Sequence, residues 1–436
     1  METLGILSLI TILIAPYEQC KIDVIVSNTT ESNVIYLTAG DNAIQKQIIL
    51  NVTNLPHANQ VSFKSDDYNV ASFDNRQNNF ILIENGFQRI NIKINAERLG
   101  ITKIRLLPSG ENSNCEVGPP IKVKVKRPNA KKLELAFQIT LGILIVFNNI
   151  GFGCKLKWKE IKEILKKPVA PIIGFLCQFL IMAPVSLLLT RMLKMSSYPS
   201  IGLVSIGCSP GGAGSNVFAV LLDASLELSI IMTTISTFTA LGTTPFWLWA
   251  LSRFIIDDGA KIEIPVVNVF TSLAAVIVPV LIGVVLTNFA VKISNVIEKY
   301  LKPFIVIIGL VFLSFGIYVY YYALQVATWR EYLGVILLSS IGYILGTSAG
   351  FIFRQGRDKA ITIGLETGFQ NMALSLLMIQ LTYDSPESDL AGVAPVIYMF
   401  AGALIPAAAV ITRLLVKIYK EKKWPWIKKV DETTDI

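Results

Sequence analysis

Residues 207–216 read GCSPGGAGSN, and they interrupt an apolar stretch with IGLVSI before them and VFAVLL after them. Pro210 removes a helical hydrogen bond and the adjoining glycines lower helix propensity, so the stretch predicts a broken helix. Ser215 and Asn216 then place polar groups in apolar surroundings, where they are costly unless another group pairs with them. Taken alone, the motif also fits a flexible kink.

The composition predicts an integral membrane protein with a separate polar region. Of the 436 residues, 53% are hydrophobic, and the mean hydropathy is +0.56. Several apolar runs reach the roughly 20 residues that a spanning helix needs. Nearly all of these runs lie in residues 131–420, whereas residues 21–130 are rich in Asn, Ser and Lys.

The N-terminus predicts a secretory signal peptide over residues 1–19, because Leu4 to Ala15 form a short apolar core. Glu2 stands where a basic residue is usual, and an uncleaved signal anchor is the alternative. Residues 20–130 are then expected to be extracellular. Asn28 and Asn51 start glycosylation sequons that agree with this placement.

Cysteine and histidine usage adds two expectations for the extracellular part. Cys20 and Cys115 form a disulfide if signal cleavage leaves Cys20 on the mature chain, and otherwise Cys115 stays free. His57 is the only histidine of the chain, and we expect it to be a solvated loop residue. Its position excludes histidine-based catalytic triads and histidine metal sites from the membrane part.

Residues 20–130 predict a small β-sandwich of the immunoglobulin-like type. Alternating or β-branched stretches are separated by turn residues such as AGDN and ENG. The expected strands are QIILNV, NNFILI, QRINIKINA, ITKIRLL and IKVKVK.

Residues 131–418 predict a polytopic α-helical domain with nine transmembrane helices, followed by a basic cytoplasmic tail at 419–436. The segments lie near 133–153, 169–191, 199–222, 225–252, 264–288, 303–323, 332–352, 360–382 and 391–416. The connections after the first, fifth and seventh segments are rich in Lys and Arg, which predicts a cytoplasmic location. The net charge of +8 reflects this bias, and we expect no nucleic-acid partner.

A second interrupted segment, ITIGLETGFQNMALSLLMIQ, occupies residues 361–380. Two broken helices in different halves of a membrane domain predict a transporter whose binding site lies near the midplane. Glu366 is a functional candidate, because an unpaired carboxylate in a membrane costs several kcal/mol by most estimates. A carboxyl group paired with a helix end, or protonated for packing, is the alternative.

Both motifs resemble signatures of the sodium/bile acid cotransporter family. The similar stretches are GCSPGGAGSNVFAVLLDASLELSIIMTTISTFTALGTTP, ETGFQN and CQFLIM, and the resemblance covers about residues 133–420. It implies a core domain, in which the two discontinuous helices cross, and a panel domain that moves against it. Most members lack an N-terminal extracellular domain. Here Ala183 also separates the QFxIM-like motif from its usual proline, and Ser209 replaces a motif cysteine.

The resemblance also implies two sodium sites, whose all-oxygen ligands suit a hard cation. The residues of the first site would be Ser215, Asn216, Ser229, Thr233 and Glu366. The second would use Gln178, Glu366, Gln370 and backbone carbonyls near Thr367 and Phe369. The helix breaks would involve Pro210, Gly211, Gly212, Gly368 and Asn371. Ser229 and Thr233 share one helix face at i, i+4, although hydrogen bonding within their own helix is the alternative for them.

The predicted function is sodium-coupled symport of a small amphipathic organic anion, such as a bile acid or sulfated steroid, by alternating access. We expect sodium as a co-transported ion, no cofactor, no enzymatic activity and a location in the plasma membrane. The alternative is a non-transporting receptor or adhesion protein that retains the transporter fold, which the extracellular domain favours. The complete oxygen set favours transport.

Overall fold

The computed structural model divides into two units, Met1–Ala130 and Lys131–Ile436. It describes residues 21–423 except for 27–32, 42–43, 54–58, 74–79, 84–85, 110–115, 128–130, 156–161, 163–165, 167, 213 and 256–265. The predicted signal peptide, Asn28, His57 and the predicted pair Cys20 and Cys115 lie outside the described residues.

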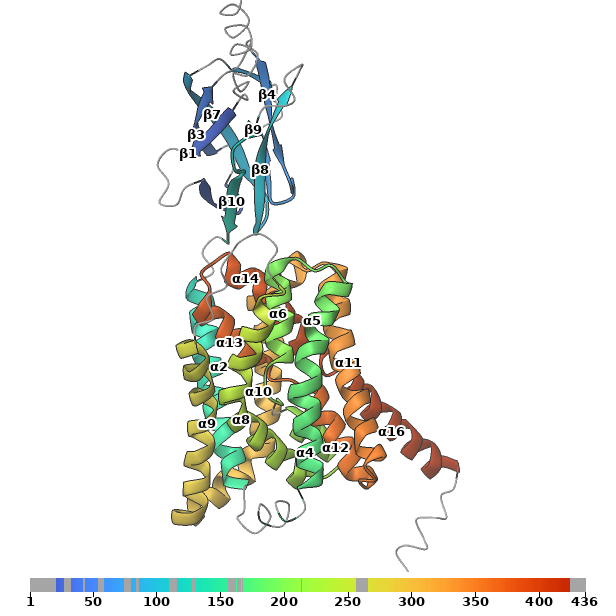
Figure 1. Cartoon of the computed structure of the whole chain (residues 1–436). Helices are drawn as coiled ribbons and strands as arrows, with labels where there is room; N and C mark the ends of the chain where they lie inside the picture. The colour runs from blue at the N-terminus through green and yellow to red at the C-terminus, as the bar shows by residue number, and fades with distance from the viewer. Residues whose placement is uncertain are drawn as a thin grey trace, which may run out of the picture. The chain divides into compact units, whose positions relative to one another are not determined.

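The described part of the first unit forms two five-stranded sheets. In sheet order, the first comprises β5 (Ala71–Phe73), β7 (Gly86–Ala96), β3 (Ile44–Thr53), β1 (Lys21–Val26) and β9 (Glu116–Val117). The second comprises β2 (Val34–Thr38), β10 (Ile121–Lys126), β8 (Gly100–Ser109), β4 (Asn59–Ser65) and β6 (Phe80–Ile83). Figure 1 shows these strands.

Alternation along the strands explains how the two sheets share one core. In β10, Ile121, Val123 and Val125 are buried while the intervening lysines are less so, and side chains from both sheets join the same hydrophobic cluster. Two sheets around one core are the arrangement of a β-sandwich. Its immunoglobulin-like type stays a prediction.

The second unit is helical. Its first half comprises α2 (Lys131–Lys155), α4 (Val169–Phe175), the π-helical η1 (Leu176–Ile181), α5 (Met182–Met192), α6 (Ser197–Gly207), α7 (Gly214–Leu221), α8 (Leu226–Ser252) and α9 (Val266–Phe289). Its second half comprises α10 (Val291–Val326), α11 (Trp329–Ile352), α12 (Arg357–Gly368), α13 (Met372–Thr382), α14 (Glu387–Ala391), α15 (Val393–Ala401) and α16 (Leu404–Lys423).

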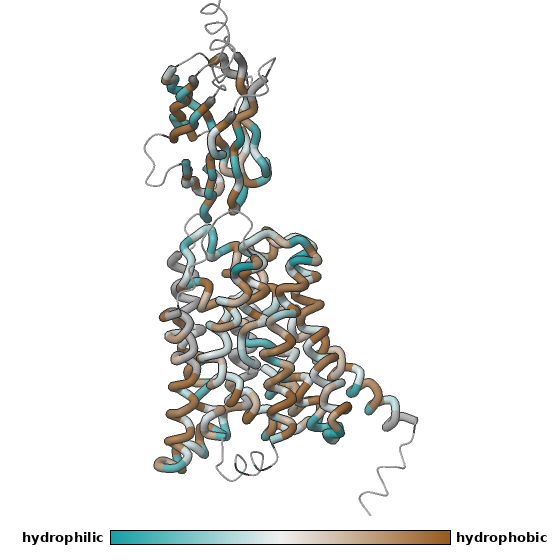
Figure 2. Tube along the Cα trace, in the orientation of Figure 1, coloured by the Kyte–Doolittle hydropathy of each residue, from teal (hydrophilic) through white to brown (hydrophobic). Residues whose placement is uncertain are grey.

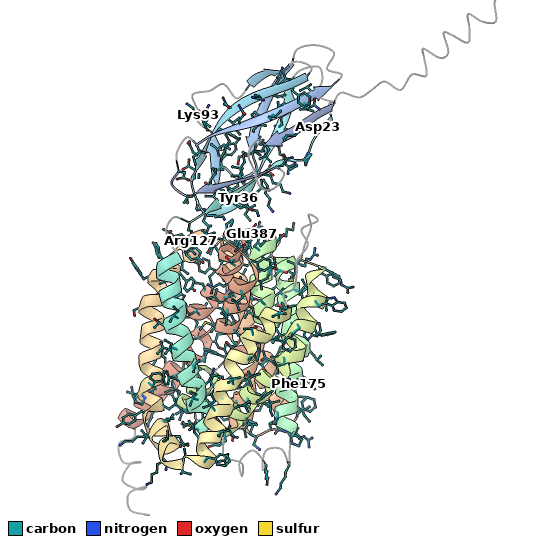
Figure 3. All side chains as sticks on the ribbon, turned by 90° about the vertical axis from the view of Figure 1, so that its left-hand side faces the viewer. Asp23, Tyr36, Lys93, Arg127, Phe175 and Glu387 are labelled. Atoms are coloured by element: carbon teal, nitrogen blue, oxygen red, sulfur yellow. The ribbon has the colours of Figure 1, made fainter. Side chains whose placement is uncertain are left out.

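Four helical runs in the described residues are long and apolar enough to cross a membrane, namely 169–192, 226–251, 329–352 and 387–419. Figure 2 shows hydrophobic residues along much of the helical unit. Figure 3 places Glu387, where α14 begins, at one end of this unit and Phe175 between its two ends. The total of nine spans stays a prediction.

The connection after α9 differs from the expectation of a basic loop. Only Ala290 separates α9 from α10, so Lys292 and Lys299 lie on a helix. The stretch VKISNVIEKYLK contains no glycine or proline that would stop a helix before Pro303. The turn is fixed by a hydrogen bond of 3.1 Å between the hydroxyls of Thr287 and Ser294.

Helices α2 and α9 pack closely because small residues face each other. A Cβ atom on Gly153 would lie 2.1 Å from the Val280 carbonyl oxygen, and one on Gly283 would lie 2.2 Å from the Ile150 carbonyl oxygen. The Thr287 hydroxyl also donates to the Cys154 carbonyl oxygen at 2.9 Å. These contacts join the two helices into one tightly packed pair.

Candidate functional site

Two interrupted helices meet at the site. One break separates α6 from α7, and the other separates α12 from α13. Gly211 and Gln370 form an isolated antiparallel bridge between the breaks. The Gly212 amide donates to the Phe369 carbonyl at 2.6 Å, and the Asn371 amide donates to the Pro210 carbonyl at 2.9 Å. The chain thus leaves helical geometry at both motifs, and backbone hydrogen bonds hold the two breaks together.

Glycines allow this close approach. A Cβ atom on Gly212 would lie 2.6 Å from the Gln370 carbonyl oxygen, and one on Gly211 would lie 2.6 Å from Glu366 Oε2. A Cβ atom on Gly368 would lie 2.3 Å from the ring of Tyr343. Real Cβ atoms do not approach a backbone oxygen this closely, so the crossing requires a glycine at position 212, whereas a side chain at position 211 would displace the Glu366 carboxylate.

A buried carboxylate lies beside the crossing and contacts three hydroxyls. Glu366 is 3% exposed. Its Oε1 lies 2.5 Å from the Ser215 hydroxyl, 2.5 Å from the Ser229 hydroxyl and 3.0 Å from the Thr233 hydroxyl. In the described part of the chain, no basic side chain forms an ion pair with Glu366. The carboxylate is therefore surrounded by hydroxyl oxygens without a side-chain countercharge.

The Thr233 hydroxyl contacts both the Glu366 carboxylate and the backbone of its own helix. Its hydroxyl lies 2.9 Å from Glu366 Oε2 and 3.0 Å from the Ser229 carbonyl oxygen on α8. Hydrogen bonding within the helix, which the sequence left as an alternative role, thus coexists with contact to the carboxylate. The i, i+4 spacing brings Ser229 and Thr233 to the same carboxylate from one helix face.

Two buried amide oxygens at the site have no hydrogen-bond partner among the described residues, namely Asn216 Oδ1 and Gln178 Oε1. Both side chains are 3% exposed. Buried polar atoms are nearly always paired, so each unpaired oxygen needs an explanation. Amide oxygens are ligands for hard cations, and both of these residues belong to the predicted sodium sets.

The second predicted set is also brought together. Gln178 Nε2 donates to the Ser209 carbonyl at 2.8 Å and to Gln370 Oε1 at 2.5 Å. Gln370 Nε2 in turn donates to the Thr367 carbonyl at 2.7 Å. Phe369 contributes its carbonyl to the backbone bridge instead, as the acceptor for the Gly212 amide.

Gln178 reaches this network from the π-helical turn η1. Such turns place one extra residue in a helix and often occur at functional sites. The spacing of apolar residues does not reveal a π-turn, and the sequence analysis noted only the displaced proline after Ala183.

Asn371 has a structural role at the second break. Its side-chain oxygen accepts a hydrogen bond from the Leu374 amide at 3.1 Å and caps α13. Tyr398 on α15, which the sequence analysis did not single out, supports the same break. Its hydroxyl accepts from the Gln370 amide at 3.1 Å and donates to the Gly368 carbonyl. No sequence signal marks this tyrosine, because it lies within an ordinary apolar run.

A small cavity adjoins the crossing, with a volume of about 40 Å³. It is lined by Asn216, Thr233 and Asn371 from the crossing region, and by Asn149 and Phe152 from α2. Asn149 is 7% exposed, and its side chain makes no hydrogen bond to another described residue. The sequence analysis missed this residue, although the pair NN within an apolar segment was a signal.

Comparison with known proteins gives a consistent set of relatives. The model of the Sodium Bile acid symporter family matches residues 142–327. The chain is 31% identical over 276 residues to the human ileal sodium/bile acid cotransporter, covering 61% of this chain and 76% of that protein. It is 28% identical over 276 residues to the rat hepatic sodium/bile acid cotransporter, covering 61% and 74%.

A third relative is a longer protein. The chain is 29% identical over 281 residues to the mouse P3 protein, covering 63% of this chain and 58% of that protein. Together with the four long apolar helical runs, these similarities establish that the chain is a multi-pass membrane protein that belongs to the Sodium Bile acid symporter family.

Proposed function

We propose that this protein is a sodium-coupled symporter that carries a small amphipathic organic anion, of the bile acid or sulfated steroid type, by alternating access. One observation carries the proposal: Glu366 is buried among three hydroxyls with no basic partner in the described residues, and Asn216, which follows the Ser215 of this cluster, has a buried unpaired oxygen. The names of the ileal and hepatic relatives, which are sodium/bile acid cotransporters, agree with it.

The chemistry of the cluster suits sodium as a transported ion. Carboxylate, hydroxyl and amide oxygens are the donors that hard cations prefer. A monovalent cation would also supply the positive charge that buried Glu366 lacks, and so offset the cost of burying it. Ser215, Asn216, Ser229, Thr233 and Glu366 would hold one ion. Gln178, Gln370 and the Thr367 carbonyl would contribute to the second.

The cavity beside the crossing supports a site for the anion. Ser215 and Asn216 lie in the first turn of α7 (Gly214–Leu221), and the positive end of a helix dipole favours anionic groups. Asn149 on α2 would contribute a neutral amide to a polar group of the substrate. The cavity of about 40 Å³ has room for about three water molecules, far less than the roughly 300–1,000 Å³ of ligand sites.

This small volume supports a moving part. A steroid-sized anion could enter only if α2 and α9 separate from α8 and the crossing. Because glycine contacts join α2 and α9, we expect them to move together as part of the panel. Such a movement would alternately expose the ion and anion sites to the two sides of the membrane.

The proposed orientation places residues 20–130 outside the cell and the tail at 419–436 in the cytoplasm of a plasma membrane protein. In Figure 1, α14 and the connection between α5 and α6 lie at one end of the helical unit, while the start of α4 and the connection between α11 and α12 lie at the other. The connections at the second end are the more basic ones, which supports its cytoplasmic placement.

Uptake of a panel of labelled bile acids and sulfated steroids by cells that express the full chain tests the proposal. We expect uptake of at least one compound in sodium medium and none above background in potassium medium. Glu366→Gln should abolish it. Glu227→Gln, the same change at an exposed position of α8, should not. Surface expression without sodium-dependent uptake of any compound would favour the receptor alternative.

A further inference from the structure

The ion pair of Arg413 marks a polar boundary on α16. The Arg413 guanidinium pairs with Asp223, whose side chain is 74% exposed, and also donates to the Leu221 carbonyl at 3.0 Å. An exposed ion pair belongs in water or among lipid headgroups rather than in hydrocarbon. The residues that follow Arg413 therefore lie outside the hydrocarbon core.

The length of this helical run leads to the same conclusion. Residues 387–419 form an apolar run of 33 residues that comprises α14, α15 and most of α16, with turns between the three helices. The nine residues of α15 and the 20 residues of α16 correspond to about 14 Å and about 30 Å at 1.5 Å per residue, together more than the roughly 30 Å of a bilayer core. Since α14 begins the run at one end of the helical unit, the final turns of α16 lie at the opposite boundary. Figure 1 shows the end of α16 running outward, away from the other helices.

These final turns carry apolar side chains that the described protein does not cover. Leu414, Leu415, Val416, Ile418 and Tyr419 are each between 48% and 61% exposed. A projection into water would leave all five side chains hydrated, which is unfavourable for an apolar patch of this size. Some apolar medium must therefore cover them.

The charge pattern identifies this medium. By helical spacing, Arg413, Lys417 and Lys420 fall on one face of α16, and Leu414, Leu415 and Ile418 fall on the opposite face, which ends at Lys422 in the last turn. Further along, the sequence KKWPWIKK adds lysines and tryptophans. Basic and aromatic residues beside an apolar helix face are typical of helices that lie in an anionic membrane interface. A second copy of this chain would bring like charges together.

We propose that the last turns of α16, residues 414–423, form an interfacial segment that binds the anionic phospholipid headgroups of the adjacent leaflet. The apolar face enters the boundary between headgroups and acyl chains, and the lysine face contacts lipid phosphates and carboxylates. Arg413 sets where α16 enters the interface, through Asp223 and the end of α7. The interaction does not depend on the transported substrate.

The test uses the full chain in nanodiscs, with an environment-sensitive fluorescent amino acid at Leu415. One set of discs contains phosphatidylcholine, and the other contains equal parts of phosphatidylcholine and phosphatidylserine. With phosphatidylserine, we expect stronger quenching by a nitroxide near the lipid headgroup and weaker quenching by aqueous iodide. Lys417→Glu with Lys420→Glu should reduce this preference by more than about fivefold per lysine, because each change also adds a repelled negative charge.

The matched control is Lys292→Glu with Lys299→Glu, an equal charge change at the start of α10, and it should keep the lipid preference. An equal loss in the control would overturn the proposal in favour of a general charge effect. Iodide quenching that is identical in both lipids would place the helix in water. Protection from both quenchers would show a protein cover, such as a second copy. If a nitroxide placed deep in the acyl chains quenched most strongly, residues 414–423 would continue the transmembrane span.

Discussion

The hydroxyl of Ser215 and the carboxylate of Glu366 are 151 residues apart in the sequence and 2.5 Å apart in the structure. They belong to different broken helices, so their contact exists only while the crossing is intact. Ser229 and Thr233 reach the same carboxylate from a third helix, α8. A substitution in this cluster can therefore affect both ion binding and the packing of the crossing helices. The variants below separate these two effects.

Sodium should raise the melting temperature of the purified protein above its value in potassium, because a ligand that binds only the folded state stabilises it by mass action. At ten times the dissociation constant the gain is about 1.4 kcal/mol. Glu366→Gln should remove most of the difference, and Glu227→Gln should retain it. Equal melting of the wild type in both salts would contradict a bound sodium ion.

Gly212→Leu should abolish the stabilisation by sodium, because even a Cβ atom there would lie 2.6 Å from the Gln370 carbonyl oxygen. Gly242→Leu is the matched control on α8, where an added Cβ atom meets nothing within 4 Å. Retained glycosylation would show that the first unit still folds in both variants. If Gly212→Leu kept the full response to sodium, the ion site would not depend on the crossing.

Asn216→Ala should weaken the affinity for sodium while leaving the melting temperature in potassium close to that of the wild type. The side-chain oxygen of Asn216 has no protein partner among the described residues, so its removal breaks no known hydrogen bond of that atom. Titration of melting temperature against sodium measures the affinity. Asn288→Ala, on the exposed part of α9, should leave the titration unchanged, and an unaltered curve for Asn216→Ala would exclude it as a ligand.

Asn149→Leu should raise the KM for the transported anion without changing the stabilisation by sodium. The Asn149 side chain lines the cavity from α2, and it is not among the groups that form hydrogen bonds with Glu366. The neighbouring Asn148→Leu serves as the control, because Asn148 does not line the cavity. Measurement of uptake against substrate concentration separates KM from the maximal rate. A change of sodium affinity alone would assign Asn149 to the ion site instead.

Glycosidase treatment should increase the gel mobility of the protein made in mammalian cells. Asn51 lies on β3, opposite Asp23 on β1 and opposite the exposed Phe87 on β7. A glycan there would lie on the outward side of the sheet, and Asn51→Gln should remove one glycan. A C-terminal tag should be stained only after permeabilisation. Staining of intact cells together with an unshifted band would contradict the proposed orientation.

The broken helices could be predicted because proline, glycine and polar residues stand out in apolar runs. Such contrasts also indicated Glu366, whose charge is conspicuous in a membrane segment. Sequence could not reveal the π-turn that carries Gln178, because its extra residue leaves the apolar pattern unchanged. It also did not indicate Tyr398, whose role depends on a contact with a residue 28 positions away.

The sheets show the same limit. Strands β3, β6, β7, β8 and β10 were predicted, whereas β1, β2, β4, β5 and β9 were not. Strands β5 and β9 have only three and two residues, too few for an alternating pattern. β2 is completed by parallel pairing with β10, which lies at the other end of the first unit in the sequence. Such pairing is a property of the folded chain rather than of a local window.

The crossing is held by main-chain bonds from Gly212 to Phe369 and from Asn371 to Pro210, in which the side-chain oxygens of the Glu366 cluster take no part. Its scaffold and its ligands can therefore diverge independently during evolution. A descendant that exchanged the hydroxyls of Ser215 or Thr233 for methyl groups would keep the same backbone while losing its response to sodium. Shape alone would then be a poor guide to ion coupling, and genomic surveys of such chains should examine these oxygen positions one by one.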